Sequence, residues 1–261
     1  MALEFGSNAP AGVYAGREVT DVWKRWATDC LAPSGKDVVD IGCGAGIYSR
    51  GFAGLGARSV VGIDLSEAYV AEAAKASPHH PSLRFALGRA DATGLPESCA
   101  DLAYMRAVIH HLSESEQAAA AAEMLRVLRP GGQCVVQDRT LADVEADAPE
   151  YWIRATLVRL YPRLIDVERA RRPNASAFTG RLRRVGFEEV VQGTLAETRK
   201  IYDSFTALET EILTRRGKSI LFELTDEQLR AYCEALRRVC PPGPVVEIDP
   251  WTVWFATSPN P

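Results

Sequence analysis

Residues 38–47 read VVDIGCGAGI, an apolar strand that runs into a glycine-rich turn and then opens a helix. Glycines at such a bend permit a sharp reversal and let a ligand approach the backbone where a Cβ would otherwise stand. The helix that follows presents its first amides, with their partial positive charge, to that ligand. The spacing is G-x-G-x-G and not the G-x-G-x-x-G of dinucleotide-binding folds, because Ile47 occupies the third glycine position. The segment therefore predicts a ligand-binding loop outside the dinucleotide class.

Short apolar runs rich in β-branched residues alternate with helical patterns around this loop, as in βαβ units. The predicted strands are residues 37–41, 59–63, 83–87, 100–105, 133–137, 187–192 and 252–257. The predicted helices lie near residues 17–31, 46–56, 66–76, 114–129, 149–171 and 176–185. Parallel strands need crossover connections, which are usually helices on both faces of the sheet. The alternation therefore predicts an α/β fold with a doubly wound, mostly parallel sheet.

Residues 196–240 depart from this alternation and predict a helical insertion between the last two strands. Apolar residues recur there at helical spacing, namely Ile201, Phe205, Leu208 and Ile212. A second helix is expected to begin at Thr225, because Gln228 follows it at capping-box spacing. The proline-rich segment 241–244 ends this helix before the final strand.

Two carboxylates follow the strands next to the glycine loop. Asp64 ends the second predicted strand about 20 residues beyond the loop, where a carboxylate accepts hydrogen bonds from ribose hydroxyls. The alternative is an ordinary helix-capping aspartate. Asp91 lies in GRADATGLP after the third strand, where it can accept from an adenine amine while Ala92 leaves room for the ring. Together with the loop, the two aspartates predict a nucleoside-containing ligand.

The segments VVDIGCGAG, VVGIDLS, GRADATGLP, LAYMRAVIHHL and LRVLRPGGQCVVQD span about residues 37–140. They resemble class I S-adenosylmethionine-dependent methyltransferases, in particular the small-molecule group related to ubiquinone and menaquinone biosynthesis methyltransferases. The resemblance implies a Rossmann-like, seven-stranded sheet whose last strand is antiparallel. It also implies a single domain over residues 1–261, with an N-terminal helical lid (1–32) and a cofactor-binding core (33–140). Helical segments 141–175 and 196–245 would cover the acceptor.

The resemblance also assigns roles to individual residues around S-adenosylmethionine. The methionine end of the cofactor would be lined by Gly42, Gly44 and Gly46, with Asp40 beside it. Asp64 would hold the ribose, and the adenine would contact Leu65, Asp91 and Ala92. Arg106 would offer its backbone carbonyl to the amino group of the cofactor, and Tyr14 or Arg17 would close over the carboxylate.

Methyl transfer from a sulfonium is an in-line displacement whose reagent is already activated, so positioning is the main task of the protein. An oxygen or carbon acceptor would still benefit from a base that takes its proton. Of the tandem His110 and His111, we expect His111 to be a general base or to orient the acceptor. The alternative is that both histidines only pack against the loop. No metal is expected, because adjacent histidines point in different directions and no recognised zinc-ligand spacing surrounds them.

The bulk composition favours a small metabolite as acceptor. The net charge of −4 offers no electrostatic footprint for a polyphosphate, so no nucleic-acid partner is expected. None of the six cysteines forms a C-x-x-C pair, no apolar run is long enough to span a bilayer, and the first residues do not read as a secretory signal. These features predict a cytoplasmic protein with reduced thiols. The acceptor and the oligomeric state stay open.

Two other functions share parts of this pattern. An NAD-dependent oxidoreductase has the same order of strand, glycine loop, helix and acidic strand, but the glycine spacing and GRADATGLP disfavour it. A non-catalytic S-adenosylmethionine-binding protein would retain the same glycines and aspartates. The sequence does not separate that possibility from an enzyme.

Overall fold

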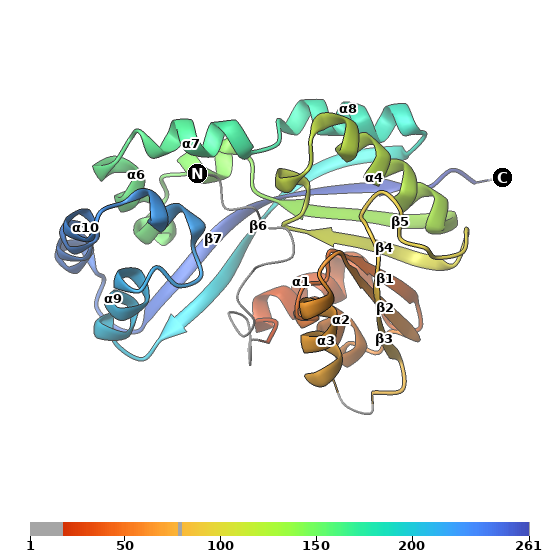
Figure 1. Cartoon of the computed structure of the whole chain (residues 1–261), viewed down its shortest axis with the longest axis horizontal. Helices are drawn as coiled ribbons and strands as arrows, with labels where there is room; N and C mark the ends of the chain where they lie inside the picture. Colours follow the sequence, from red (N-terminus) through yellow and green to blue (C-terminus); the bar gives the residue numbers. More distant parts are fainter. Residues whose placement is uncertain (1–17, 78–79, 261) are drawn as a thin grey trace. The chain divides into compact units, whose positions relative to one another are not determined.

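The computed structural model describes residues 18–77 and 80–260, and it contains one seven-stranded sheet in the order β3-β2-β1-β4-β5-β7-β6 (Figure 1). The strands are β1 (Asp37–Ile41), β2 (Ser59–Asp64), β3 (Leu83–Leu87), β4 (Ala100–Arg106), β5 (Leu128–Asp138), β6 (Glu188–Tyr202) and β7 (Val245–Thr257). β1 pairs in parallel with β2 and β4, β2 with β3, and β4 with β5, whereas β7 runs antiparallel to β5. The predicted α/β fold, with its mostly parallel sheet and antiparallel final strand, is confirmed.

The α-helices follow the predicted alternation through the first half of the chain. They are α1 (Asp21–Leu31), α2 (Ile47–Gly54), α3 (Glu67–Lys75), α4 (Glu114–Val127), α5 (Leu141–Glu145), α6 (Trp152–Leu160), α7 (Leu164–Arg171), α8 (Ala175–Val185), α9 (Phe205–Leu213) and α10 (Asp226–Val239). Three short 3-10 helices are η1 (Ile109–His111), η2 (Pro149–Tyr151) and η3 (Ser219–Glu223). No helix in the described part of the chain is long and apolar enough to cross a membrane.

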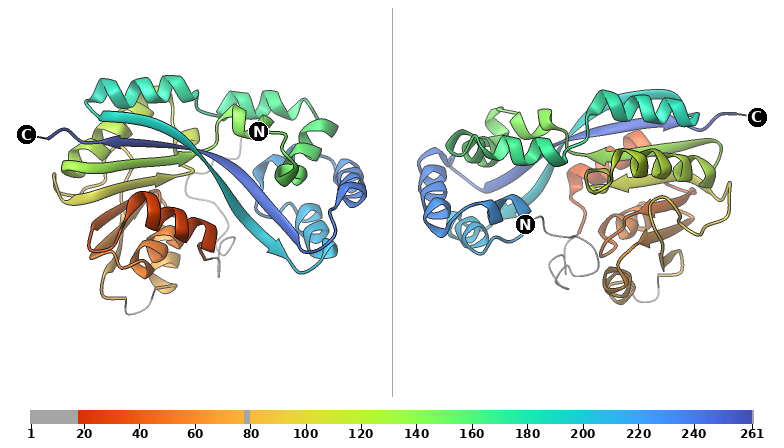
Figure 2. Two further views of the ribbon diagram at one scale, coloured as in Figure 1. Left: turned by 180° about the vertical axis from the view of Figure 1, so that it is seen from behind. Right: turned by 45° about the horizontal axis from the view of Figure 1, so that its top comes forward.

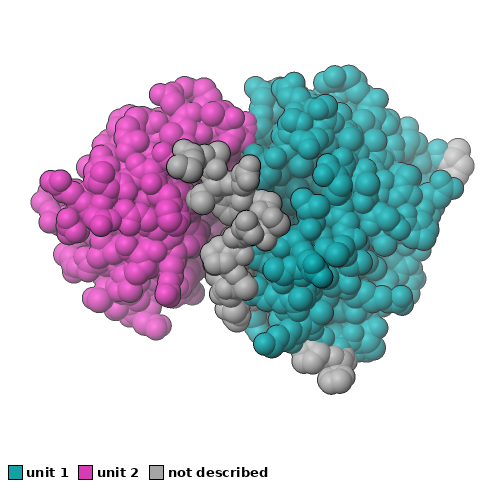
Figure 3. Space-filling view, in the orientation of Figure 1, with its two compact units in different colours: residues 1–138, 173–194, 252–261 teal, residues 139–172, 195–251 magenta. Residues whose placement is uncertain are grey.

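The chain divides into two compact units, coloured separately in Figure 3. Unit 1 comprises residues 1–138, 173–194 and 252–261, and unit 2 comprises residues 139–172 and 195–251. β6 and β7 each contribute residues to both units. Unit 2 thus contains most of residues 141–175 and 196–245, the two segments expected to cover the acceptor.

In unit 1, helices cover both faces of the sheet. α4 and α8 lie side by side on one face and share a core with β1, β4 and β5 (Figures 1 and 2). On the other face, fully buried Trp23 of α1 packs edge-on against Phe52 of α2 and Tyr104 of β4. The Trp23 Nε1–H donates to Tyr104 Oη at 3.2 Å, and Tyr104 Oη donates to Gln137 Oε1 at 2.6 Å. This contact chain ties α1 to the strands whose ends carry the candidate site.

Two predicted helix boundaries are wrong. The helix expected over residues 114–129 begins with a capping box of Ser113 and Glu116, but it ends at Val127, and Leu128 is already extended and paired with Ala100 of β4. The helix expected over residues 149–171 is divided into η2, α6 and α7. Pro162 lies between α6 and α7, where its ring and missing amide disfavour a continuous helix.

The helical insertion is shorter than predicted. β6 extends to Tyr202, so Ile201 belongs to a strand and not to a helical stripe, and β7 begins at Val245. The predicted helical spacing is confirmed for Phe205, Leu208 and Ile212, which lie in α9, and the predicted capping box of Thr225 and Gln228 begins α10. In unit 2, α6, α9 and α10 enclose a separate apolar core that includes Leu208, Tyr232 and Leu236.

Candidate functional site

The glycine loop connects β1 to α2 at the carboxyl edge of the sheet. Gly42 and Gly46 both have φ of 74°, a conformation that L-side chains rarely adopt. A Cβ on Gly42 would stand 2.2 Å from Val108 Cγ2, and one on Gly46 would stand 2.8 Å from the Phe85 ring. A Cβ on Gly44, whose φ is 52°, would meet no atom within 4 Å. Gly42 and Gly46 thus allow tight packing beneath the loop, while Gly44 leaves an open surface above it.

Asp64 joins this loop to the end of β2. Its Oδ2 accepts a hydrogen bond from the Gly44 amide at 2.8 Å, and its Oδ1 accepts one from the Ser66 amide at 2.9 Å. Ser66 itself caps α3 through its side chain, so Asp64 is not the N-cap of that helix. Between them, Leu65 exposes 60% of its surface. The carboxylate is held in place by two backbone amides beside an exposed apolar side chain, which is the arrangement expected for a ribose and an adjoining adenine.

Asp40 lies beneath the loop and is buried. Ser49 Oγ donates to its Oδ2 at 2.6 Å. Burial raises the pKa of the Asp40 carboxyl to about 7, with a further increase from the charge of Asp64, while Ser49 and Arg106 act in the opposite direction. The Arg106 guanidinium lies 4.3 Å from the centre of the Tyr48 ring. Asp40 is therefore a carboxyl group whose charge depends on pH near neutrality and on a nearby cation.

Asp91 lies in the loop after β3 and is bound by Arg89. The guanidinium donates through Nε to Oδ1 at 2.8 Å and through Nη2 to Oδ2 at 3.1 Å. These bonds to Arg89 are the main reason why the pKa of Asp91 lies below its usual value. The next residue, Ala92, is exposed. Because a carboxylate has about four lone-pair positions, the Arg89 fork leaves Asp91 able to accept a further hydrogen bond.

The tandem histidines differ in their surroundings. His110 Nδ1 lies 2.8 Å from Oδ1 and 3.0 Å from Oδ2 of Asp138, the last residue of β5, and the His110 backbone amide donates to Oδ2 at 3.2 Å. His111, the residue that the sequence favours as a base, is exposed, and its ring centre lies 3.9 Å from that of His110. Sequence reasoning missed Asp138. The signal that could have found it is its position directly after the predicted strand 133–137, just as the histidines follow the predicted strand 100–105.

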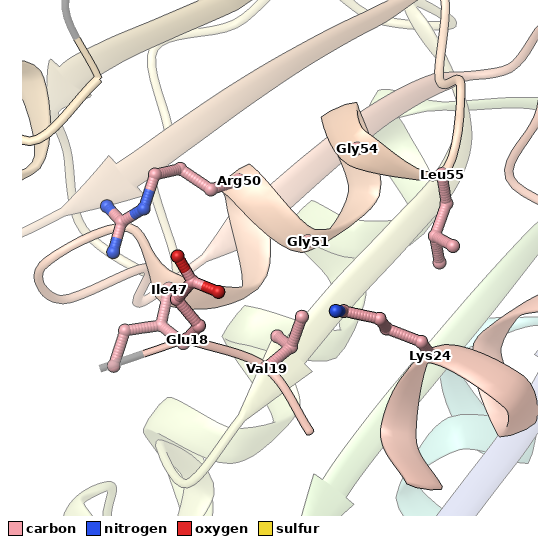
Figure 4. A pocket seen from close by; sticks show the side chains of 8 residues that line it. All are labelled: Glu18, Val19, Lys24, Ile47, Arg50, Gly51, Gly54 and Leu55. Atoms are coloured by element: carbon pink, nitrogen blue, oxygen red, sulfur yellow. The ribbon is translucent and has the colours of Figure 1, made fainter. Parts of the chain in front are cut away.

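An open groove of about 310 Å³ adjoins the glycine loop from outside (Figure 4). It lies between the start of α1 and the helix α2, and its lining includes Glu18, Lys24, Ile47 and Arg50. Arg50 Nη1 donates to the carbonyl of Ala45 at 2.8 Å and so braces the loop. The predicted lid residues Tyr14 and Arg17 lie outside the described residues.

No group of three or more His, Cys, Asp or Glu side chains in the described residues is placed to hold a metal ion. The residues that the structure brings together at the carboxyl edge are the glycine loop, Asp40, Asp64, Leu65 and Arg106. Asp91 and Ala92 follow β3, which pairs with β2 in register from Leu83 to Leu87.

Comparison with known proteins gives a family match for the core of the chain. Residues 39–136 match the family model described as a methyltransferase domain. Over 136 residues the chain is 30% identical to a 2-methyl-6-phytyl-1,4-hydroquinone methyltransferase of Synechocystis sp.. The aligned region covers 52% of this chain and 42% of that protein. Over 118 residues it is 36% identical to a demethylmenaquinone methyltransferase of Beutenbergia cavernae, covering 45% and 47%. The match thus spans less than half the length of either curated relative.

A solved structure extends the likeness in fold over nearly the whole chain. A putative methyltransferase from an antibiotic biosynthesis pathway of Anabaena variabilis superposes with a TM-score of 0.68 at 20% identity, covering 92% of this chain and 98% of that one. Residues 39–136 therefore match a methyltransferase domain, and nearly the whole chain shares the fold of this solved structure. These likenesses lend no support to an oxidoreductase.

Proposed function

We propose that this chain transfers a methyl group from S-adenosylmethionine to a small-molecule acceptor. The observation that carries the proposal is the Asp64 carboxylate, which the amides of Gly44 and Ser66 hold at the carboxyl end of β2 beside the glycine loop. Ligands of open α/β sheets bind in this position, outside the carboxyl ends of the strands. The family match of residues 39–136 supports the same conclusion.

The residues present fit the cofactor. Gly44 has open space where a Cβ would stand, so the loop can lie against the methionine end without a steric clash. Asp64 uses one lone pair of each oxygen for an amide and keeps the others for the two ribose hydroxyls. Leu65 offers an exposed apolar surface to one face of adenine, and Asp91 offers a carboxylate to its amine.

Asp40 and Arg106 would serve the amino group of the methionine end. Bringing an ammonium group near the buried Asp40 carboxyl favours its ionised form, which burial otherwise disfavours. The backbone carbonyl of Arg106 would accept from the same ammonium. Its side chain lies over the Tyr48 ring, which is consistent with the main chain of Arg106 being the part that serves the ligand.

The bound cofactor supplies a methyl group that is already activated as a sulfonium. The contribution of the chain is to hold the acceptor in line with that methyl and to keep water away, a positioning effect that can lower the barrier by roughly 7–11 kcal/mol. Because positioning is the main contribution, the described core residues explain how the cofactor would bind, and they do not specify which acceptor is used.

A small metabolite is the favoured acceptor. The Synechocystis and Beutenbergia relatives act, by their names, on a hydroquinone and on demethylmenaquinone. The net charge of −4 gives no basic surface of the kind that recruits nucleic acid, which is why we disfavour that partner. All six cysteines are free thiols, which supports a reducing, cytoplasmic location.

The test is incubation of the full chain with methyl-deuterated S-adenosylmethionine and a set of hydroquinones, followed by mass spectrometry of the acceptors and of S-adenosylhomocysteine. We expect label in one of the acceptors and an equal amount of S-adenosylhomocysteine. Cofactor binding without transfer to any small molecule would favour the non-catalytic binding protein. Failure to bind the cofactor would contradict the proposed function.

A further inference from the structure

His110 and Asp138 form a hydrogen-bonded pair in which the carboxylate is the deeper member. Both carboxylate oxygens lie within 3.0 Å of His110 Nδ1, and the Asp138 side chain is 0% exposed while that of His110 is 14% exposed. The His110 amide also donates to Asp138, so the backbone and the ring are held by one carboxylate. A buried carboxylate held in this way fixes the orientation of the ring.

This pairing also selects the tautomer of the imidazole. A carboxylate can only accept a hydrogen bond, so Nδ1 must carry the proton that lies between the two groups. In the neutral imidazole Nε2 then carries the lone pair, and it has no hydrogen-bond partner among the described residues. A histidine whose Nδ1–H is held by a carboxylate and whose Nε2 is left with a lone pair is suited to take a proton from a bound molecule.

The pair lies at the edge of the sheet that carries the glycine loop. Arg106 and Gln137 are paired at the ends of β4 and β5, and Asp138 follows Gln137. Val108 lies two residues before His110, and its side chain occupies the space that a Cβ on Gly42 would fill, 2.2 Å from Cγ2. The segment that carries His110 therefore packs directly against the loop assigned to the methionine end of the cofactor.

We propose that His110 is the general base that takes a proton from the methyl acceptor, and that the acceptor presents a phenolic or alcoholic hydroxyl at this site. This inference rests on the proposed methyl transfer. As the methyl group is transferred, the hydroxyl proton moves to Nε2 of His110, and the electron pair of the acceptor forms the new bond to the methyl carbon. The bond between that carbon and sulfur breaks with its electron pair on sulfur, which becomes a neutral thioether. Asp138 acts as a positioning residue that stabilises the resulting imidazolium.

His111 is exposed, and its ring is tilted by 46° to that of His110. The charged groups around η1 are Asp138 on β5 and the ion pair of Glu114 and Arg181, which joins α4 to α8. Gln117 of α4 is neutral and donates to the carbonyls of Ile109 and Leu112. Within the described ranges, Asp138 is the charged side chain that hydrogen-bonds to the His110 ring.

The experiment compares His110→Gln, His111→Gln, Asp138→Asn and the matched control His80→Gln in the full chain. His80 is exposed, and its ring lies within hydrogen-bond distance of the nearby Ser82 hydroxyl. The acceptors are hydroquinone, 2-methylhydroquinone and catechol, with iodide as an acceptor that has no proton to lose. Affinity for S-adenosylhomocysteine, measured by calorimetry, reports on folding and on the cofactor site independently of turnover.

We expect the wild type to methylate at least one phenol and not iodide. His110→Gln should lose about a hundredfold or more in kcat with little change in KM, because a general base contributes roughly 10²–10⁴-fold. Asp138→Asn should also lose kcat with little change in KM, whereas His80→Gln should match the wild type. Added imidazole should restore part of the activity of His110→Ala.

Nitrogen-15 spectra of histidine-labelled chain test the pair without any acceptor, and they should show His110 protonated at Nδ1 and bare at Nε2. A loss of activity in His111→Gln without one in His110→Gln would overturn the assignment. Binding of S-adenosylhomocysteine without methylation of any phenol would overturn the acceptor class. Absence of that binding would instead contradict the proposed function.

Discussion

The backbone amide of Gly44 donates to the carboxylate of Asp64 across 2.8 Å, which joins the loop after β1 to the end of β2. These residues are 20 positions apart in the chain. The bond fixes the carboxylate relative to the loop before any ligand arrives, so the ribose that we propose for this site would bind with little reorganisation. A preorganised site of this kind gains affinity because less conformational freedom is lost on binding.

Gly44→Ala should weaken cofactor binding more than it weakens the fold. Its φ of 52° makes alanine cost about 1–2 kcal/mol, and the new methyl would project into the open space over the loop. Gly35→Ala is the matched control, because Gly35 has φ of 73° and equally open surroundings in the turn before β1. Both variants should lose similar stability in urea, but only Gly44→Ala should lose affinity for S-adenosylhomocysteine. Equal affinities in the two variants would contradict the placement of the cofactor.

Asp40→Asn should change the pH dependence of stability. Burial raises the pKa of Asp40 to about 7 from 3.8, so the folded state binds more protons than the unfolded state between these values. The contribution of Asp40 to stability is therefore complete below pH 3.8 and is lost as the pH rises through 7. Asparagine carries no such charge, so the unfolding free energy of the variant relative to the wild type should increase from pH 4 to pH 8. The increase should be at most about 4 kcal/mol, since one pKa unit is worth about 1.4 kcal/mol. A constant difference would show that Asp40 ionises normally.

Glu247→Gln should destabilise unit 2 strongly. The Glu247 carboxylate is buried and pairs with Lys218 and with Arg199, so its removal leaves two buried cations with less counter-charge. Although burial opposes ionisation, these cations hold the pKa of Glu247 to about 2. We expect a loss of about 3–5 kcal/mol by urea unfolding. The surface pair of Glu209 with Arg237 provides the control, and Glu209→Gln should cost less than about 1 kcal/mol.

The same carboxylate gives a second pH dependence of opposite sign. Because the folded pKa of Glu247 is depressed, its contribution is present above the unfolded value of 4.5 and disappears as the pH falls toward 2. The deficit of Glu247→Gln should therefore shrink in acid. A deficit that stays constant down to pH 3 would mean that the charge of Glu247 is not what stabilises the unit.

Asp91→Ala should abolish discrimination at the adenine amine. The wild type should bind S-adenosylhomocysteine more tightly than S-inosylhomocysteine, in which a carbonyl replaces the amine and faces the Asp91 carboxylate. The variant should bind the two ligands with similar affinity, because no acceptor is left to distinguish them. Competitive calorimetry measures both. Unchanged discrimination in Asp91→Ala would assign adenine recognition to another group.

The common core could be predicted from the sequence because local signals and burial agree there. β1 and β3 have the predicted bounds, and the glycine loop lies where the apolar strand ends. The ends of β6 and β7 were missed for a physical reason. Their inward-facing positions carry buried charged residues, Glu197 on β6 and Glu247 and Asp249 on β7, so the alternation of apolar and polar residues is hidden. The charges on β7 are tolerated because Arg199 of β6 pairs with Glu247 and Arg154 of α6 pairs with Asp249.

The choice between the two histidines likewise depends on tertiary structure. Both follow β4 in the sequence, and nothing in their immediate neighbours separates them. What distinguishes His110 is the carboxylate of Asp138, which lies 28 residues later and reaches the histidine because β5 pairs with β4. Local patterns do not carry information of this kind.

The most direct test of the central claim is calorimetric titration of S-adenosylmethionine and S-adenosylhomocysteine into the wild type, Asp64→Ala and the control Asp37→Ala. Asp37 lies at the opposite end of β1 and binds Arg58 and Arg129, so its loss perturbs the fold without touching the ribose site. We expect micromolar binding to the wild type and to Asp37→Ala, and a loss of about a hundredfold or more in Asp64→Ala, because hydrogen bonds to a charged group contribute about 1.5–3 kcal/mol each. Absence of binding to the wild type, or equal binding to Asp64→Ala, would contradict the account.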